Sequence, residues 1–238
     1  MLQNGRFLAF DTSTDVMSVA LTDGARVWQH TGPGGAKAST TLIPVILSLL
    51  ADAGMALGDL HAIAFGRGPG SFTGLRTACA VAQGLAFGAN SGAGIPVLPI
   101  DTLLAVAEEA RLQHASQHIT ALLDARMDEM YVQRYACSQG VLTPVGHCEL
   151  SRPEALVPEP GTLYAGNVFE VYRGRLPEDL NSVTCLPTAT AMLRLAPRLA
   201  ASGQCVNAAQ ALPLYVRDKV AQTTEEREQV KALKLLTA

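Results

Sequence analysis

The sequence predicts an α/β protein made of two structurally related halves. Three observations lead to this expectation. Strands and helices follow the order βββαβαβα in the first half, a short acidic motif recurs near the middle of the chain, and two helices of the first half carry almost no charge. With 238 residues, 48% of them hydrophobic and 16% charged, the chain can bury a sizeable core and divide into two domains.

The first three elements are expected to be antiparallel strands. Residues 6–10 form an apolar run, and residues 16–22 alternate in polarity up to the Asp23-Gly24 turn, after which Val27 begins a third strand. A D-G dipeptide between two such runs is typical of a hairpin. The first half therefore opens with a three-stranded meander.

Helices and strands alternate after the meander. A helix is expected over 41–53, with Thr41 as its N-cap and Pro44 in its first turn, where a missing N–H is harmless. The elements expected next are a strand at 61–65, a helix at 73–88, a strand at 97–100 and a helix at 102–113.

A motif of the first half recurs in the second half at a fixed offset of 113 residues. Each copy reads as an apolar strand, an acidic turn and a second strand. A chance match is the alternative, but such repeats usually mark repeated structural units, so we favour a duplication. The recurring residues are Asp11, Asp15, Met17 and Val19 in the first copy and Asp124, Asp128, Met130 and Val132 in the second.

The second half is expected to depart from the first after its opening strands. Strands are predicted at 131–135 and 141–150, followed by a capping box at 151–154 in a short, proline-interrupted region. Helical spacing resumes at 188–201. The tail from Thr223 has acids first and lysines later, which suits either a terminal helix or a frayed end.

The glycine-rich stretch F-G-R-G-P-G-S-F-T-G-L-R at 65–76 has two interpretations. Backbone N–H groups at the start of the following helix can bind an anion such as phosphate. Alternatively, the glycines and Pro69 only permit a tight reversal between a strand and a helix. The stretch matches neither the P-loop nor the dinucleotide-binding pattern, so we favour the steric interpretation.

The predicted helices at 41–53 and 73–88 are apolar around most of their circumference. From residue 77 to residue 100 there is no charged side chain. A helix that is apolar on all sides is buried on all sides. One apolar side of each helix can pack on the sheet of its own domain. The other apolar side must be covered by the second domain or by another polypeptide. We favour a protein partner, because the small residues of the second helix permit close helix approach.

No catalytic constellation stands out. His114 and His118 have a spacing that suits a helical metal pair, but their polar neighbours favour two solvated histidines. Asp11 and Asp124 each follow a predicted strand, where two facing carboxylates would hold Mg²⁺, and each can equally cap its own turn. Ser71 matches a nucleophile elbow only loosely. The residue pattern alone therefore does not identify a reaction.

Composition argues against several classes of protein. A net charge of −3 provides no broad basic surface, so any RNA role would need a partner. Five scattered cysteines form no C-x-x-C pair, which argues against a disulfide framework or a zinc site and favours a reducing cytoplasm. No signal peptide, membrane span or membrane partner is expected.

Four segments occur in a fixed order along nearly the whole chain. They are F-L-A-F-D-T-S-T-D-V-M-S-V-A-L at 7–21, the glycine-rich stretch at 65–76, L-D-A-R-M-D-E-M-Y at 123–131 and L-P-L-Y-V-R-D-K-V-A at 212–221. Together they resemble the bacterial TsaB (YeaZ) family, and the glycine-rich stretch is the most specific of the four.

The resemblance implies two tandem RNase H-like domains of the actin/hexokinase/Hsp70 (ASKHA) type. The first is expected at 1–113 and carries the partner helices. The second, more degenerate domain is expected at 114–238, with a terminal segment that can pack back on the first.

The resemblance also implies a function. TsaB-like proteins are non-catalytic partners, or scaffolds, of TsaD, a paralogue that forms N6-threonylcarbamoyladenosine next to the anticodon of tRNAs reading codons that start with A. The expected partners are TsaD in a heterodimer, the small ATPase TsaE, a second copy when the chain is alone, and tRNA only through the complex. No cofactor is required of this chain, weak ATP or ADP binding stays open, and the metal is expected in TsaD alone.

The family pairs through its first two long helices, which correspond to 41–53 and 73–88 here. No catalytic or metal-binding residue is expected in this chain. The expected partner-interface residues are Leu42, Val45, Ile46, Leu49, Leu75, Cys79, Ala82 and Ala86. Residues that would lie near a nucleotide are Asp11, Gly68, Gly70, Ser71 and Thr73.

Two positions depart from related sequences. Thr102 and Val106 take the places of the two metal-binding histidines of the catalytic paralogue, and neither side chain binds Fe or Zn as imidazole does. Many relatives carry Glu-His before the first interface helix, where this chain has A-K-A-S-T at 36–40 with Ala38 in that stretch. Any role of that histidine is absent here.

Two other functions are alternatives to the scaffold role. An Mg-dependent ATPase or sugar-kinase-like enzyme would use Asp11 and Asp124 around the metal. A peptidase that cleaves the paralogue ranks last, because no nucleophile–base pair is recognisable.

Overall fold

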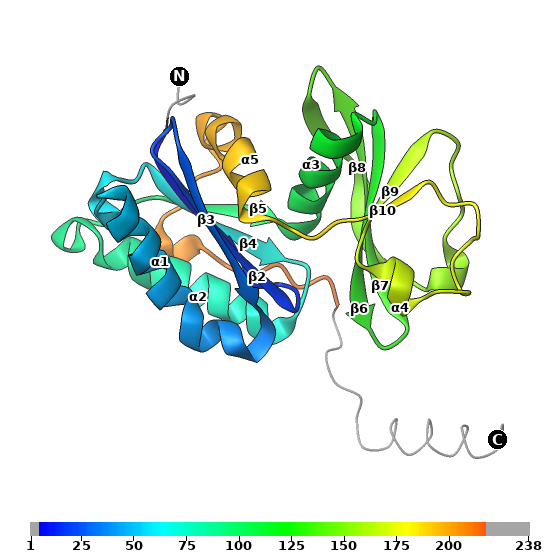
Figure 1. Ribbon diagram of the computed structural model, residues 1–238, viewed down its shortest axis with the longest axis horizontal. Coiled ribbons are helices and arrows are strands. Elements are labelled where there is room, and N and C mark those ends of the chain that lie inside the picture. Colours follow the sequence, from blue (N-terminus) through cyan, green and yellow to red (C-terminus); the bar gives the residue numbers. More distant parts are fainter. Residues whose placement is uncertain (1–4, 218–238) are drawn as a thin grey trace, which may run out of the picture.

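Two five-stranded mixed sheets form the centres of two domains (Figure 1). The computed structural model describes residues 5–217. No helix among these residues is long and apolar enough to span a membrane.

The first sheet has the order β3-β2-β1-β4-β5. β1 pairs antiparallel with β2 and parallel with β4, so the antiparallel meander continues into a parallel half. The five strands and the three helices that follow β3, β4 and β5 in the chain have the βββαβαβα order that the sequence predicts. The strands are β1 (Phe7–Asp11), β2 (Val16–Thr22), β3 (Val27–Pro33), β4 (Ala62–Gly68) and β5 (Val97–Asp101).

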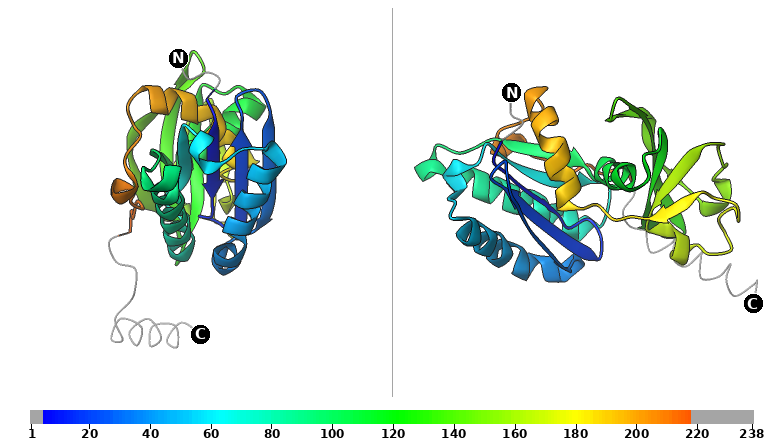
Figure 2. Two further views of the ribbon diagram at one scale, coloured as in Figure 1. Left: turned by 90° about the vertical axis from the view of Figure 1, so that its left-hand side faces the viewer. Right: turned by 45° about the horizontal axis from the view of Figure 1, so that its top comes forward.

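Helices cover both faces of this sheet (Figures 1 and 2). α1 (Ala38–Ala53) and α2 (Phe72–Gly88) lie side by side on one face. On the opposite face lies α5 (Ala189–Ala201), which contacts β1 and β2. Two apolar clusters fill the two interfaces, so the central strand β1 is buried along its whole length.

α1 begins three residues before the predicted start. Ala38 is its first residue and is fully buried, and Thr41 therefore lies inside the helix instead of capping it. The preceding turn is held by backbone bonds from Gly34 N to Asp15 O (2.8 Å) and from Gly35 N to Thr14 O (3.3 Å). This anchoring starts the helix earlier than the capping preference of a threonine does.

The second sheet repeats the plan of the first, with the order β10-β9-β6-β7-β8. Its central strand β6 pairs antiparallel with β7 and parallel with β9, as β1 does with β2 and β4. The shared plan matches the duplication inferred from the repeated motif. The strands are β6 (His118–Arg126), β7 (Glu129–Ser138), β8 (Val141–Ser151), β9 (Thr162–Gly166) and β10 (Ser182–Thr184).

Helix α3 (Thr102–His114) lies between the two domains. It packs on β6 of the second sheet and on α5 of the first domain (Figure 2). On the other face of the second sheet lies the short helix α4 (Val168–Val171). The predicted division after residue 113 falls at the end of α3. After β10 the described chain returns to the first domain through α5 and a backbone pairing between Val206 and Val97.

Two smaller predictions have different outcomes. The helix expected at 188–201 is α5, and Thr188 caps it, with its hydroxyl accepting a hydrogen bond from Ala191 N (3.1 Å). The capping box predicted at 151–154 is absent, because Pro153 starts a single 3-10 turn that Arg152 precedes without a side-chain cap. The predicted tail from Thr223 lies outside the described residues.

Candidate functional site: an interdomain pocket and an exposed helix pair

Asp11 lies at the carboxyl end of β1 and is completely buried. Its Oδ1 accepts hydrogen bonds from Ser13 N (2.8 Å) and Ser13 Oγ (2.6 Å), and Thr102 Oγ1 donates to Oδ2 (3.3 Å). Burial raises the pKa of this carboxyl group to about 6, although the bonds from Ser13 and Thr102 favour the charged form. Asp11 therefore organises the turn after β1 and does not face an open site.

Three glycines from the end of β4 to the start of α2 are required by the close approach of this turn. A Cβ at Gly66 would collide with the Asp11 carboxylate, one at Gly70 would lie 2.7 Å from Ser13 O, and one at Gly74 would collide with Thr12 O. Ser71 N also donates to Ser13 O (2.7 Å). These contacts support the steric interpretation of the glycine-rich stretch, because the absence of side chains lets two backbone segments touch.

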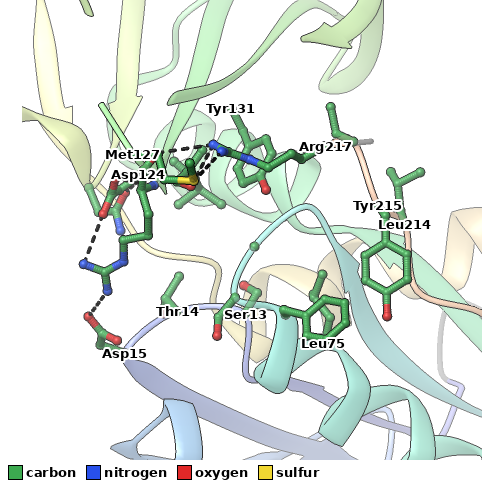
Figure 3. A pocket seen from close by; sticks show the side chains of 18 of the residues that line it. Ser13, Thr14, Asp15, Leu75, Asp124, Met127, Tyr131, Leu214, Tyr215 and Arg217 are labelled. Carbon is green, nitrogen blue, oxygen red and sulfur yellow. Dashed lines mark hydrogen bonds and ion pairs between the residues drawn. The ribbon is translucent and has the colours of Figure 1, made fainter. Parts of the chain in front are cut away.

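A pocket of about 470 Å³ lies between the glycine-rich stretch and the second domain (Figure 3). Of the residues expected near a nucleotide, Gly70 and Ser71 line this pocket, whereas Asp11, Gly68 and Thr73 do not. The opposite wall is formed by the end of β6 and the β6–β7 turn, residues 123–127. A third wall is formed by residues 214–217.

The structure does not place the two aspartates as a pair of open carboxylates. Asp124 lines the pocket, but its Oδ1 accepts bonds from Tyr172 OH (2.8 Å) and Arg126 N (2.9 Å), and its Oδ2 is ion-paired with Arg126 (3.4 Å). Asp11 is buried behind the turn. Within residues 5–217 no three histidine, cysteine or acidic side chains gather as a metal site.

The two histidines with helical spacing do not share a helix. His114 is the last residue of α3, Ala115 turns the chain with φ of 48°, and His118 begins β6. Both imidazoles are exposed, as the solvated interpretation predicts.

Thr102 and Val106, which are expected to take the places of the paralogue's histidines, are fully buried in α3. Thr102 bonds to Asp11 and Val106 packs in the apolar cluster between α3 and the second sheet. Neither side chain presents a ligand to a metal.

The expected partner-interface residues are corrected by the structure. Seven of the eight are at most 8% exposed and pack inward, and only Val45 is half-buried. A side chain already enclosed by its own domain is not available to a partner. The enclosed residues are Leu42, Ile46, Leu49, Leu75, Cys79, Ala82 and Ala86.

The opposite stripes of α1 and α2 are exposed and nearly uncharged. Ile43 is 42% exposed, Leu47 is 51% exposed and Phe87 is 73% exposed. Only Asp52 and Arg76 carry charge within the two helices. We call the exposed side of these two helices the α1/α2 face. Ile43 and Leu47 have the i, i+4 spacing of one helix stripe. The sequence did not identify this stripe as the exposed one, because the inward positions of α1 are equally apolar.

The repeated sheet plan and the interdomain pocket define the class of protein: two tandem RNase H-like domains of the ASKHA type. A family model described as TsaD, tRNA N6-adenosine threonylcarbamoyltransferase, matches residues 32–236. The tRNA threonylcarbamoyladenosine biosynthesis protein TsaB of Haemophilus influenzae is 34% identical, over 92% of this chain and 96% of its own length.

A second curated relative with the same description, from Escherichia coli, is 32% identical over 91% of this chain and 96% of its own length. A solved structure described as YeaZ from Pseudomonas aeruginosa has a TM-score of 0.80 and 38% identity, over 89% of this chain and 99% of that one. The chain belongs to the TsaB (YeaZ) branch of the TsaD family.

Proposed function

We propose that this chain is a non-catalytic scaffold in the formation of N6-threonylcarbamoyladenosine next to the anticodon of tRNAs reading codons that start with A. It acts in tRNA threonylcarbamoyladenosine biosynthesis, the pathway named for its curated relatives. In this proposal the chain works in the cytoplasm and binds a TsaD-type threonylcarbamoyltransferase through the α1/α2 face.

The exposed, nearly uncharged α1/α2 face is the observation that carries the proposal. Exposed apolar side chains spaced along neighbouring helices are unfavourable in water and mark protein interaction sites. Two small residues of α2, Ala80 and Gly84, are also exposed and permit a second pair of helices to approach closely. Such a face suits a helical, uncharged surface on the partner.

The pocket supports a non-catalytic role for this chain. Its residues from the described part of the chain include no histidine and no lysine to act as a base beside Ser71. The carboxylate of Asp124 is held by Tyr172 and Arg126. The proposal therefore places the metal and the transfer chemistry in the TsaD partner, and assigns this chain at most weak ATP or ADP binding near Gly70.

The first test is binding to the TsaD-type paralogue. Leu47→Asp places a charge on the α1/α2 face, and we expect the dissociation constant to rise about tenfold or more, as for other buried interface anchors. Leu112→Asp is the matched control, because Leu112 is an exposed helical leucine (56%) on α3, away from this face. Equal binding by both variants and by the unmodified chain would remove the proposal.

The same variants test the remaining partners. We would measure the mass in solution of the chain alone and of the chain mixed with the paralogue and TsaE. These masses distinguish a homodimer, a heterodimer and the larger assembly through which the chain would contact tRNA. Leu47→Asp is expected to abolish the homodimer as well. Cys79→Glu and Ala82→Glu are unsuitable for this test, because both side chains are enclosed in the monomer and a charge there would unfold it.

A further inference from the structure

Residues 211–217 follow both domains before the described chain ends, and we call them the interdomain strap. They begin beside α2 and end beside the β6–β7 turn, where Figure 3 shows Arg217 next to Met127. Four of them, residues 214–217, line the interdomain pocket. The strap therefore contacts both domains, at parts of the chain that are far apart in sequence.

The first contacts of the strap fix its start to α2. Ala211 O accepts hydrogen bonds from Gln83 Nε2 (2.8 Å) and from Cys79 Sγ (3.1 Å). Further along, Leu214 N donates to Arg67 O (2.7 Å) in β4. These bonds join backbone groups of the strap to two side chains of α2 and to the backbone of β4.

Tyr215 adds a side-chain contact at the beginning of α2. Its ring lies 5.4 Å from the Phe72 ring, centroid to centroid, and its hydroxyl accepts a hydrogen bond from Arg76 Nε (3.2 Å). The Arg76 guanidinium also lies over the Phe72 ring, 3.8 Å from its centroid. Tyr215 is thus attached to the same helix that presents the α1/α2 face.

The last residues of the strap attach to the second domain. Arg217 Nη2 donates to Ala125 O (3.1 Å) and forms an ion pair with Glu129 (2.7 Å). Val216 packs against the apolar cluster between α3 and the second sheet. The Arg217 side chain is only 14% exposed, so its bonds are shielded from solvent.

Arg217 stabilises a turn with an unfavourable backbone. Arg126, Met127 and Asp128 have φ values of 61°, 56° and 61°, a left-handed region that residues other than glycine rarely occupy. Three such residues in succession persist only where surrounding contacts hold them. Arg217 supplies several of these contacts, including a bond from Nη2 to Arg126 O (3.3 Å).

We propose that the interdomain strap is a mechanical link between α2 and the β6–β7 turn, and that it holds the interdomain pocket closed on one side. Loosening either end of the strap then loosens the contact at the other end, in the domain that was not altered. The link is independent of which protein occupies the α1/α2 face.

Hydrogen exchange of the full chain tests the link from the first domain. Tyr215→Ala removes the ring contact with Phe72 and the hydrogen bond from Arg76. We expect amide exchange at 125–129 in the second domain to become about three- to tenfold faster, which is the change in the opening equilibrium expected when one aromatic pair is lost. The control is Leu212→Ala, since Leu212 belongs to the strap but is 63% exposed. We expect its exchange to match the unmodified chain.

The reverse experiment starts from the second domain. Arg217→Gln keeps a polar side chain but removes the ion pair with Glu129, and we expect exchange at 67–72 in the first domain to become about tenfold faster, in line with the loss of charge-assisted bonds. Arg173→Gln is the control, because it breaks an exposed ion pair with Glu170 in the same domain.

The two variants together decide the proposal. Faster exchange in the unaltered domain in both cases, with a cooperative thermal transition retained, supports the link. If each variant accelerates exchange only in the domain that its side chain contacts, residues 211–217 are two independent local contacts and the proposal is wrong. Should one variant fail to fold, the other alone gives the same decision.

Discussion

At the scale of single residues, the carboxylate of Asp11 stabilises the turn after β1. Asp11 is enclosed by the turn after β1, the glycine-rich stretch and α3. Its oxygens accept three hydrogen bonds from Ser13 and Thr102, which compensate part of the cost of burying a charge. The raised pKa shows that burial outweighs these bonds.

The pKa of Asp11 predicts how stability depends on pH. The folded chain raises this pKa from 3.8 to about 6, so the folded state binds a proton more tightly than the unfolded state does. The contribution of Asp11 to the free energy of unfolding is therefore larger at low pH and is lost as pH rises toward 6 and above. Between pH 7 and pH 5 we expect a gain of about 1 kcal/mol from this group.

Urea unfolding of the unmodified chain and of Asp11→Asn, each at pH 7 and pH 5, measures this contribution. The difference between the two pH values should shrink by about 1 kcal/mol in Asp11→Asn. Asp52→Asn, which changes an exposed aspartate of α1, should leave the difference unaltered. A pH response that survives Asp11→Asn in full contradicts the assignment.

At the scale of elements, α2 has two faces with opposite requirements. Its start touches the turn after β1 so closely that Gly74 has no room for a side chain. Further along, Gly84 lies on the exposed α1/α2 face, where an added Cβ meets no atom within 4 Å. Both are glycines of one helix, yet only the first is required by packing within the monomer.

Alanine substitutions at these two glycines should have opposite effects. Gly74→Ala forces apart two backbones, and we expect it to lower the free energy of unfolding by about 2 kcal/mol or more. Gly84→Ala gains helix propensity and should raise it by up to about 1 kcal/mol. Thermal or urea unfolding of the two variants measures both effects, and destabilisation by Gly84→Ala would mean that the α1/α2 face is covered within the monomer.

At the scale of the whole molecule, the junction of α3 and α5 is one of the connections between the two domains. Glu108 is only 3% exposed and is ion-paired with Arg111 on its own helix and with Arg194 on α5 (3.1 Å). Arg194 also pairs with Glu109 (2.8 Å), whose pKa is lowered by bonds from Thr188 and Arg194 despite its partial burial. This network joins the helix between the domains to the helix that returns to the first domain.

Removing the cation of this network should destabilise the fold. Arg194→Met keeps the apolar length of the side chain but leaves Glu108 with a single partner, and we expect a loss of about 1–3 kcal/mol in the free energy of unfolding. Arg173→Met, which breaks a solvent-exposed ion pair with Glu170, should cost at most about 0.5 kcal/mol. Equal losses in the two variants would show that the network adds nothing beyond a surface ion pair.

Much of the fold could be predicted from the sequence because its signals are local. Alternating apolar runs and the Asp23-Gly24 turn predict the elements, and the motif around Asp11 and Asp124 predicts the repeated sheet. The glycine-rich stretch also indicates a tight reversal, since glycine is the residue that permits close backbone approach.

The sequence by itself determined the order of the elements, the duplication and the presence of two weakly charged helices. Only the tertiary structure decided which stripe of each helix faces the core, because a helix that is apolar all round has no inward preference of its own. It also decided that Asp11 is enclosed and that the strap reaches both domains. Those contacts join segments up to 139 residues apart, and no local periodicity records them.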